Sequence, residues 1–392
     1  MVMNIFGFAT ITPVILLLVA AGVGGIWGWL AVLYITLFTF FMDRLARERP
    51  SEDPGAGSEF PAGRRLAVFL GVAHFVLLAA AIWAIAGPSG HGLAERVVAL
   101  AGFGLFFGQV SHPNAHELIH SGNRRLYALG RVIYATLLFG HHVSAHRLVH
   151  HVHVATDDDP SSAPIGESFW AFLPRAWVHG FYEGYLAENV LLARAGRSQR
   201  SLRHPYVGHI LGAVGTMALA AVIGGLPGVV ALLVLAAYAQ FQILLSDYVQ
   251  HYGLRRAQLP GGKMAPVGPE HAWNAPHWYS SAMMLNAPRH SDHHINPARP
   301  YHSLKLDPET MPVLPHSMPV MAVLALWPER WHMVMDPLAA EWHPSNSAPD
   351  PFERLASARA AMNPKDARKR PAEGDAKPAK PAAPATPQTA AE

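Results

Sequence analysis

The sequence predicts an all-α integral membrane protein with six transmembrane helices in three hairpins and a cytoplasmic histidine-rich region. Three observations lead to this prediction. Hydrophobic residues make up 51% of the 392 residues and charged residues only 15%, whereas soluble domains usually contain about 25% charged residues. Several predominantly apolar runs are long enough to cross a bilayer, which takes about 17–25 residues of helix. Histidine is unusually frequent, because 24 histidines stand against 27 aspartates and glutamates together.

Each expected hairpin consists of two apolar runs joined by a short turn. Gly24 and Gly25 separate the first two runs, and Pro227 and Gly228 separate the last two. Both residue types interrupt helices and favour turns. The expected spans are residues 5–22, 26–42, 66–87, 93–110, 207–225 and 229–245.

Lysine and arginine lie almost entirely on one side of these spans. The turns after the first, third and fifth spans contain neither, whereas the segments after the second, fourth and sixth contain several arginines. Cytoplasmic loops carry an excess of basic residues. We therefore expect the long segments 111–206 and 246–335, and both termini, to be cytoplasmic.

The chain is expected to form one membrane-embedded domain and one tail. Residues 1–345 contain all the apolar runs and all the histidines. Residues 346–392 are rich in alanine, proline and lysine and have no apolar periodicity. Because such a segment cannot bury enough apolar surface to fold, it is predicted to be a disordered tail.

The composition excludes several kinds of function. Cysteine is absent, which excludes disulfides, cysteine nucleophiles and cysteine-ligated metal centres. The net charge is only +3, and no dense basic run indicates nucleic-acid binding. No Gly-x-Gly-x-x-Gly motif follows a predicted strand, so no flavin or nicotinamide site is expected.

Histidines recur at helical spacing in the expected cytoplasmic segments. The first motif holds His116 and His120, which are four residues apart and therefore lie on one face of a helix. The second motif holds His146 and His150 at the same spacing. It adds His151, which on a helix points about 100° away from His150. Such an adjacent pair suits two different metals better than one.

A third motif and one separate histidine complete the set. His290, His293 and His294 follow one another at helical spacing, so both later residues are expected to face His290, and His251 stands alone just after the sixth expected span. These imidazoles are too many for one metal, which takes about four to six ligands, and they suit two. Imidazole binds zinc, copper, iron and nickel alike, so the spacing does not choose among them.

The other histidines are expected to be surface or packing residues. Five of them lie close to the motifs and are weaker candidates for a direct metal role: His141, His142, His153, His271 and His277.

Four stretches together resemble the membrane-bound non-haem di-iron superfamily of desaturases and hydroxylases, and within it the alkane 1-monooxygenase family. They are His116-Glu117-Leu118-Ile119-His120, the stretch from His150 to Asp159-Pro160, Gln250-His251-Tyr252-Gly253-Leu254 and Arg289-His290-Ser291-Asp292-His293-His294. The resemblance covers about Phe6 to Trp331, with the six expected spans in matching places. The combination is specific, whereas the first stretch alone is not.

The resemblance implies that the histidine-rich region is a di-iron catalytic region in which nine histidines hold two iron ions. The implied ligands are His116, His120, His146, His150, His151, His251, His290, His293 and His294. Their division between the two irons stays open. All-imidazole ligation makes nearby carboxylates important as acceptors for the distal ring N–H groups. The candidates are Glu117, Asp157, Asp158, Asp159, Asp247 and Asp292. We expect Glu117 and Asp292 to serve in catalysis, and Asp292 is favoured because ligands flank it.

The resemblance also implies the reaction and its partners. It implies an alkane 1-monooxygenase of the bacterial inner membrane, which hydroxylates medium-chain alkanes to primary alcohols with molecular oxygen as co-substrate. Rubredoxin and its reductase would supply the electrons, which agrees with the absence of cysteine from this chain. A lipophilic alkane would reach the site from the membrane lipid.

The chain departs from the family pattern at several positions beside the histidines. Ala145 and Gln250 stand where the family has glutamate, Val149 where it has glycine, and Ser121 where it has lysine, while Ala287-Pro288 replaces Leu-Gln. No departure removes an implied ligand. The substrate range and the partners are therefore less firmly implied than the reaction class.

Three alternatives remain open. A fatty-acyl or lipid desaturase or hydroxylase of the same superfamily would share the histidine pattern and differ in its product. An intramembrane zinc protease would use His116-Glu117-x-x-His120 with Glu117 as general base, but it leaves six clustered histidines unexplained. A metal transporter would need ionisable residues inside its spans, and the expected spans contain few.

Overall fold

The computed structural model describes residues 2–45, 61–87 and 89–343, and it is built from helices. Within these ranges the only β-pairings are two isolated bridges, so the all-α prediction is confirmed there. The tail predicted for residues 346–392 lies outside the described residues.

Among the described residues, five helices are long and apolar enough to cross a membrane: Ile5–Val23, Ile26–Leu45, Gly63–Ala86, Leu93–His120 and Pro205–His251. The first lies in α1 (Val2–Val23), and the second comprises α2 (Ile26–Leu33), the π-helix η1 (Tyr34–Phe38) and α3 (Thr39–Leu45). The third lies in α4 (Pro61–Ala86), and the fourth comprises α5 (Leu93–Phe106), the π-helix η2 (Phe107–Ser111) and α6 (His112–His120). The fifth is α11 (Pro205–His251). Together they account for the apolar composition.

The first expected hairpin has a turn that needs glycine. Gly24 and Gly25 have φ values of 71° and 62°, which residues with a side chain rarely adopt. A Cβ atom on Gly24 would also lie 2.7 Å from Oε1 of Glu95. That carboxylate accepts hydrogen bonds from the backbone N–H groups of Gly25 and Gly92, so it ties the first hairpin to the start of α5.

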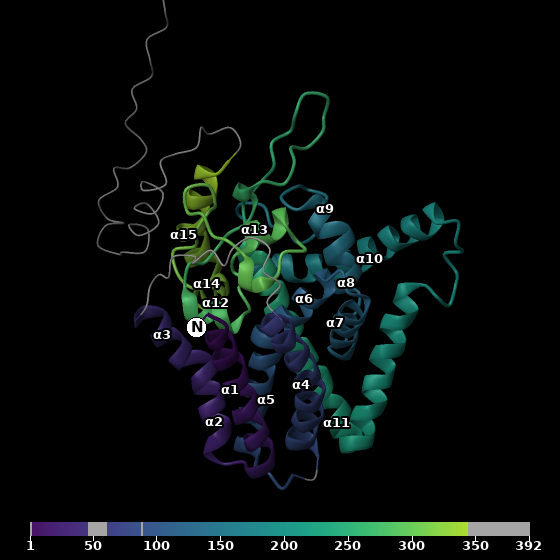
Figure 1. The fold of residues 1–392 in the computed structure, drawn as a ribbon, viewed down its shortest axis with the longest axis vertical. Helices are drawn as coiled ribbons and strands as arrows, with labels where there is room; N and C mark the ends of the chain where they lie inside the picture. The colour runs from purple at the N-terminus through teal and green to yellow at the C-terminus, as the bar shows by residue number, and fades with distance from the viewer. Residues whose placement is uncertain (1, 46–60, 88, 344–392) are drawn as a thin grey trace, which may run out of the picture.

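The fifth and sixth expected spans are the two arms of the fifth apolar helix, α11, which is broken at Gly225. Gly225 has φ 62° and ψ −150°, which is not helical. The chain reverses there, and Figure 1 shows the two arms of α11 diverging upward from its lower end. Residues 207–225 and 229–245 thus occupy separate arms.

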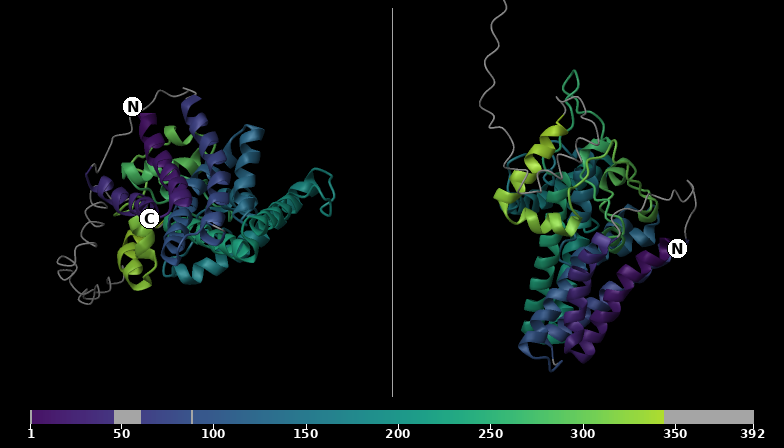
Figure 2. Two further views of the ribbon diagram at one scale, coloured as in Figure 1. Left: turned by 90° about the horizontal axis from the view of Figure 1, so that it is seen from below. Right: turned by 90° about the vertical axis from the view of Figure 1, so that its left-hand side faces the viewer.

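The remaining elements form a cap over one end of the apolar helices. They are α7 (Arg124–Thr136), α8 (His142–Ser144), the π-helix η3 (Ala145–His150), α9 (His151–His153), α10 (Phe169–Arg194), η4 (Pro269–His271), α12 (Trp278–Met283), α13 (His290–Ile295), η5 (Tyr301–Ser303), α14 (Met318–Ala325) and α15 (Pro328–Glu341). Figures 1 and 2 show the turns between α1 and α2, between α4 and α5, and inside α11 at the opposite end.

Two groups of buried side chains hold these parts together. One lies among the apolar helices and includes Phe103, Phe106 and Leu235. The other joins the second arm of α11, which follows Gly225, to the cap and includes Tyr248 and Trp331. The histidine motifs lie where the spans meet the cap.

Candidate metal centre

The first histidine pair is carried by an extension of a membrane helix. The fourth expected span ends at residue 110, but the helix continues through η2 into α6 as far as His120. Pro113 lies in the first turn of α6, where its missing N–H is not needed. His116 and His120 therefore share one helix face, with ring centroids 5.0 Å apart.

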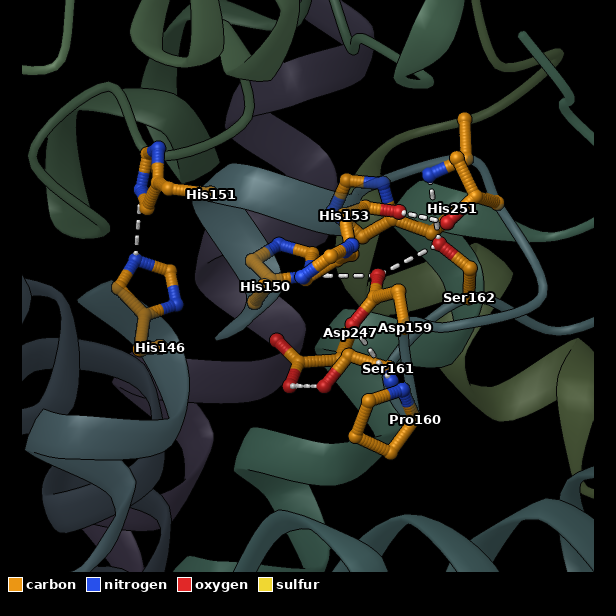
Figure 3. Close-up of polar contacts among 12 residues, drawn as sticks. His146, His150, His151, His153, Asp159, Pro160, Ser161, Ser162, Asp247 and His251 are labelled. Carbon is orange, nitrogen blue, oxygen red and sulfur yellow. Dashed lines mark hydrogen bonds and ion pairs between the residues drawn. The ribbon is translucent and has the colours of Figure 1, made fainter. Parts of the chain in front are cut away.

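A π-helix determines which histidines of the second motif approach one another. η3 spans Ala145–His150, and a π-helix closes its hydrogen bonds between residues i and i+5. Residue i+5 therefore lies over residue i. Accordingly Nε2 of His151 lies 3.0 Å from Nε2 of His146, as Figure 3 shows. The His150 ring lies beside that of His251, with ring centroids 4.5 Å apart.

The third motif contributes histidines to two separate groups of imidazoles. On α13, Nε2 of His294 lies 3.1 Å from Nε2 of His290, and His290 lies 3.0 Å from His251 at the end of α11. His293 instead approaches His151, with 3.1 Å between their Nε2 atoms. His293 stacks on His290 with ring centroids 5.5 Å apart, but its ligand nitrogen groups with those of α6, η3 and α9.

The nine histidines form two groups in which every ligand atom lies within 4.8 Å of the others. We call them the five-histidine cluster (His116, His120, His146, His151 and His293) and the four-histidine cluster (His150, His251, His290 and His294). Adjacent His150 and His151 fall into different clusters, as their spacing predicted.

The geometry of both clusters fits one metal ion in each. Two nitrogens bound at about 2.1 Å from one metal and at right angles lie about 3 Å apart. The shortest Nε2–Nε2 distances in the five-histidine cluster are 2.8 to 3.1 Å, and those in the four-histidine cluster are 3.0 and 3.1 Å. Nε2 of His120 and Nε2 of His150 are buried and have no hydrogen-bond partner, which is expected of metal ligands.

Burial keeps most of these imidazoles neutral, the form that binds metals. Burial and the neighbouring imidazoles lower the pKa values of His146, His151, and His293 well below the usual value. The same causes act on His290 and His294. Protons therefore compete little with a metal at these five rings.

His150 is the exception, because a buried carboxylate binds it. Burial by itself lowers the pKa of His150, but the charge of Asp159 and its hydrogen bond more than offset burial, so this pKa is raised. Nδ1 of His150 lies 2.9 Å from Oδ2 of Asp159. Ser162 Oγ donates to the same oxygen, and the N–H of Ser161 donates to Oδ1. Figure 3 shows this network, which leaves Nε2 of His150 free for a metal.

The two carboxylates that we expected to serve in catalysis lie elsewhere. Glu117 accepts the backbone N–H of Tyr301 and lines a separate pocket of about 390 Å³ beside Arg64 and His302. It points away from the clusters because it is offset by one residue from His116. Asp292 binds Arg299 and the N–H of Lys305. The carboxylate that contacts a cluster histidine is Asp159.

Some histidines beside the motifs have partners outside the clusters, and others pack against cluster histidines. His153 and His271 have other partners, since His153 is 41% exposed beside Asp158 and His271 accepts the N–H of Gly268. His142 is buried and stacks on His146, with ring centroids 5.4 Å apart. His112, which the sequence analysis missed, lies one turn before His116, and its Nδ1 is 2.9 Å from the hydroxyl of Tyr134. Its i, i+4 spacing to His116 was the available signal.

Two departures from the family pattern fit this packing. The Nε2 amide of Gln250 donates to the carbonyl of Ala287 at 3.1 Å, which a glutamate cannot do. Gln250 and the altered Ala287-Pro288 pair are therefore linked. Ala145 lies where α10 approaches closely, because a Cβ atom on Gly184 would be 2.9 Å from the backbone nitrogen of Ala145.

An apolar cavity of about 580 Å³ leads to both clusters. Its walls come from η1, α3, α5, α11 and α14 and include Leu105, Phe241 and Val323. Histidines of both clusters, His116, His146 and His290, line it together with His112 and His142. A long apolar molecule that lies in this cavity would therefore present one part of itself to the clusters.

Comparisons with known proteins agree with this arrangement. Residues 93–322 match the fatty acid desaturase family. The chain is 30% identical to alkane 1-monooxygenase 2 of Alcanivorax borkumensis over 326 residues, which are 81% of this chain and 84% of that protein. It is 28% identical to alkane 1-monooxygenase 2 of Pseudomonas aeruginosa over 79% of this chain and 84% of that protein. Alkane 1-monooxygenase 1 of A. borkumensis is 34% identical over 58% of this chain and 56% of its own length.

Proposed function

The chain belongs to the alkane monooxygenase family, and from this membership we propose that it hydroxylates the terminal methyl group of medium-chain alkanes. The balanced reaction takes an alkane, one oxygen molecule, two electrons and two protons to a primary alcohol and water. The observation that carries the proposal is the apolar cavity that ends on histidines of both clusters. A polar substrate would gain nothing from such walls.

We assign one iron ion to each cluster. Iron, when bound, supplies the redox chemistry that activates oxygen and breaks an unactivated C–H bond, which redox-inactive zinc does not. The five-histidine and four-histidine clusters would hold the two ions. The close grouping of ligand nitrogens fits an ion in each cluster, and Asp159 fixes which nitrogen of His150 faces the metal.

The cavity walls orient the substrate. Leu105, Phe241 and Val323 exclude water from the alkyl chain, and burial of each CH₂ group contributes about 0.8 kcal/mol to binding. His116 and His290 lie at the part of the wall that faces the clusters. Apolar contacts along the chain therefore hold one end beside the reacting centre, which favours attack at the terminal carbon.

We propose that electrons come from rubredoxin and its reductase on the side of the cap, which would be the cytoplasmic side of the bacterial inner membrane. The basic segments on that side support this orientation. Because the chain has no cysteine, single cysteines placed at Ser89 and Ser198 can be labelled separately. In intact cells an impermeant reagent should label position 89 and spare position 198. The reverse pattern would refute the orientation. Labelling of both positions would refute the proposed arrangement of six spans in three hairpins, because it would place them on the same side of the membrane.

The main alternative is a fatty-acyl or lipid desaturase or hydroxylase, which the fatty acid desaturase match keeps open. A zinc protease is disfavoured, because Glu117, its required general base, lies in a different pocket from the clusters.

Metal analysis and product identification test the proposal together. Purified protein should contain two irons per chain. With an alkane, labelled oxygen gas and reduced rubredoxin, it should form a primary alcohol that carries one labelled oxygen. An unlabelled alkene, or activity confined to acyl substrates, would reject the alkane reaction. A single zinc per chain would reject the metal assignment.

A further inference from the structure

Helix α10 exposes a long apolar face within a segment expected to be cytoplasmic. Trp170, Trp177, Val178, Phe181 and Tyr185 are separated by seven, one, three and four residues, which places them along one side of the helix. Their exposed fractions range from 37% to 54%. An exposed apolar patch of this size marks an interaction site.

This exposed face is distinct from the side of α10 that packs on the protein. Phe172, Ala176 and Gly180 are buried on the packed side. The indole N–H groups of Trp170 and Trp177 are bonded to Leu326 and Gln240, so these two side chains need no water partner. The exposed apolar residues continue around the helix, because Tyr182, Leu186 and Val190 are also exposed. α10 therefore has one side packed on the protein and a broad exposed side on which apolar residues predominate.

A row of arginines follows this helix. Arg194, Arg197, Arg200 and Arg203 are exposed, and the segment 194–204 contains no acidic residue. None of the ion pairs recorded between described residues includes these arginines. Clusters of arginine and lysine beside a membrane helix bind anionic lipid headgroups.

The position of the row agrees with such a partner. α11 begins at Pro205, and it is apolar enough to span the membrane, whereas α10 is not among the candidate spans. The arginines therefore stand where the chain enters the bilayer. Figure 1 shows α10 extending sideways from the cap above the descending first arm of α11.

From these observations we infer that α10 and the following arginines form a membrane-interface anchor, in which the aromatic face of α10 lies in the headgroup region and the arginines bind anionic phospholipid. The anchor adds to the spanning helices. It fixes the cap, and thus the cavity and the clusters, against the bilayer surface.

Spin labels test the placement of α10 in the full chain. Single cysteines replace Val178, Phe181 and Tyr185 on the apolar side of α10, and Lys263 and Glu309 at exposed positions elsewhere in the cap, in bilayer discs that contain phosphatidylglycerol. Oxygen concentrates in lipid and a nickel chelate stays in water. Labels on the apolar side should collide several-fold more with oxygen than with the chelate, and the labels at positions 263 and 309 should show the reverse. An apolar side that favours the chelate, or that is shielded from both because another protein covers it, would overturn the inference.

Lipid analysis tests the arginines independently. In the double variant Arg197→Gln with Arg200→Gln, the phosphatidylglycerol that co-purifies with the protein should fall at least twofold relative to phosphatidylethanolamine. The matched control is Lys263→Gln with Arg330→Gln, which removes two exposed charges elsewhere in the cap. Equal lipid ratios in both variants would refute the anionic-lipid contact. Neither readout depends on metal or turnover, so the outcome is separate from the proposed reaction.

Discussion

The five-histidine and four-histidine clusters share the second and third motifs, but their surroundings differ. Within the described part of the chain, the recorded side-chain hydrogen bonds of the five-histidine cluster join imidazoles to one another. The four-histidine cluster is also bound by a buried carboxylate, through Asp159 and His150. A single carboxylate contact thus gives two neighbouring sites, built from the same type of residue, different electrostatics.

The difference extends to the source of the ligands. Two of the five-histidine ligands lie on one helix, α6, where spacing alone brings them together. The four-histidine cluster needs His251 from the end of α11 and His150 from η3, beside the pair on α13. The five-histidine ligands come from four elements and the four-histidine ligands from three, so both clusters depend on tertiary packing. Loss of one ligand leaves the four-histidine cluster with three.

Removal of a ligand should have the largest effect. We expect His251→Ala and His120→Ala each to lower turnover by at least about 100-fold. Removal of a ligand's carboxylate partner typically lowers metal affinity or activity by about 10–100-fold, and removal of the ligand itself should lower activity further. His251→Ala should also lose about one iron per chain, whereas His120→Ala should retain more, because four ligands remain around its metal. Iron analysis and product formation measure both effects. His91→Ala, outside both clusters, is the control, and full activity in His251→Ala would break the two-metal assignment.

The carboxylate contact should matter less than a ligand and should act on one cluster only. Asp159→Asn removes the charge beside His150 and is expected to weaken metal binding at the four-histidine cluster by about 10–100-fold. Binding at the five-histidine cluster should stay unchanged. Competition with a chelator, followed by iron counting, separates the two sites. Asp158→Asn changes the neighbouring residue, which is 81% exposed, and should have no effect. Equal losses in both clusters would contradict the assigned role.

Acid should distinguish the clusters without any mutation. The pKa of His150 is raised, whereas an ordinary histidine has a pKa of about 6.5. As the pH falls from about 8 toward 5, the ring of His150 therefore gains a proton before an ordinary histidine does. That proton competes with the metal of the four-histidine cluster. The pKa values of His146, His151 and His293 are lowered, so the five-histidine cluster should keep its metal at lower pH. Dialysis across this range should release one metal before the other, and a single release step would contradict the difference.

Truncation of the tail should have the smallest effect. The composition after residue 365 cannot supply a folded core, so a chain that ends there is expected to retain the metal content of both clusters within about 10%. Iron counting on the full and shortened chains is the test. Loss of either metal on truncation would assign the tail a structural role.

Composition and local spacing were enough to predict the all-α class, the apolar helices and the nine histidines. His116 and His120 are four residues apart, and α6 places them in one cluster as any helix would. The same reasoning missed the anchor helix α10, because its exposed apolar residues alternate with buried and polar ones and never form a continuous apolar run.

Only the tertiary structure decided how the ligands divide and what supports them. The π-helix η3 pairs His146 with His151, although their spacing alone favours His146 with His150. The loop after α9 brings Asp159 to His150, while Asp292, which is adjacent to a ligand in sequence, turns to Arg299. The physical reason is that a carboxylate's partner depends on the direction of its side chain in the folded packing. Where a helix departs from 3.6 residues per turn, the number of residues between two side chains does not predict whether they point the same way.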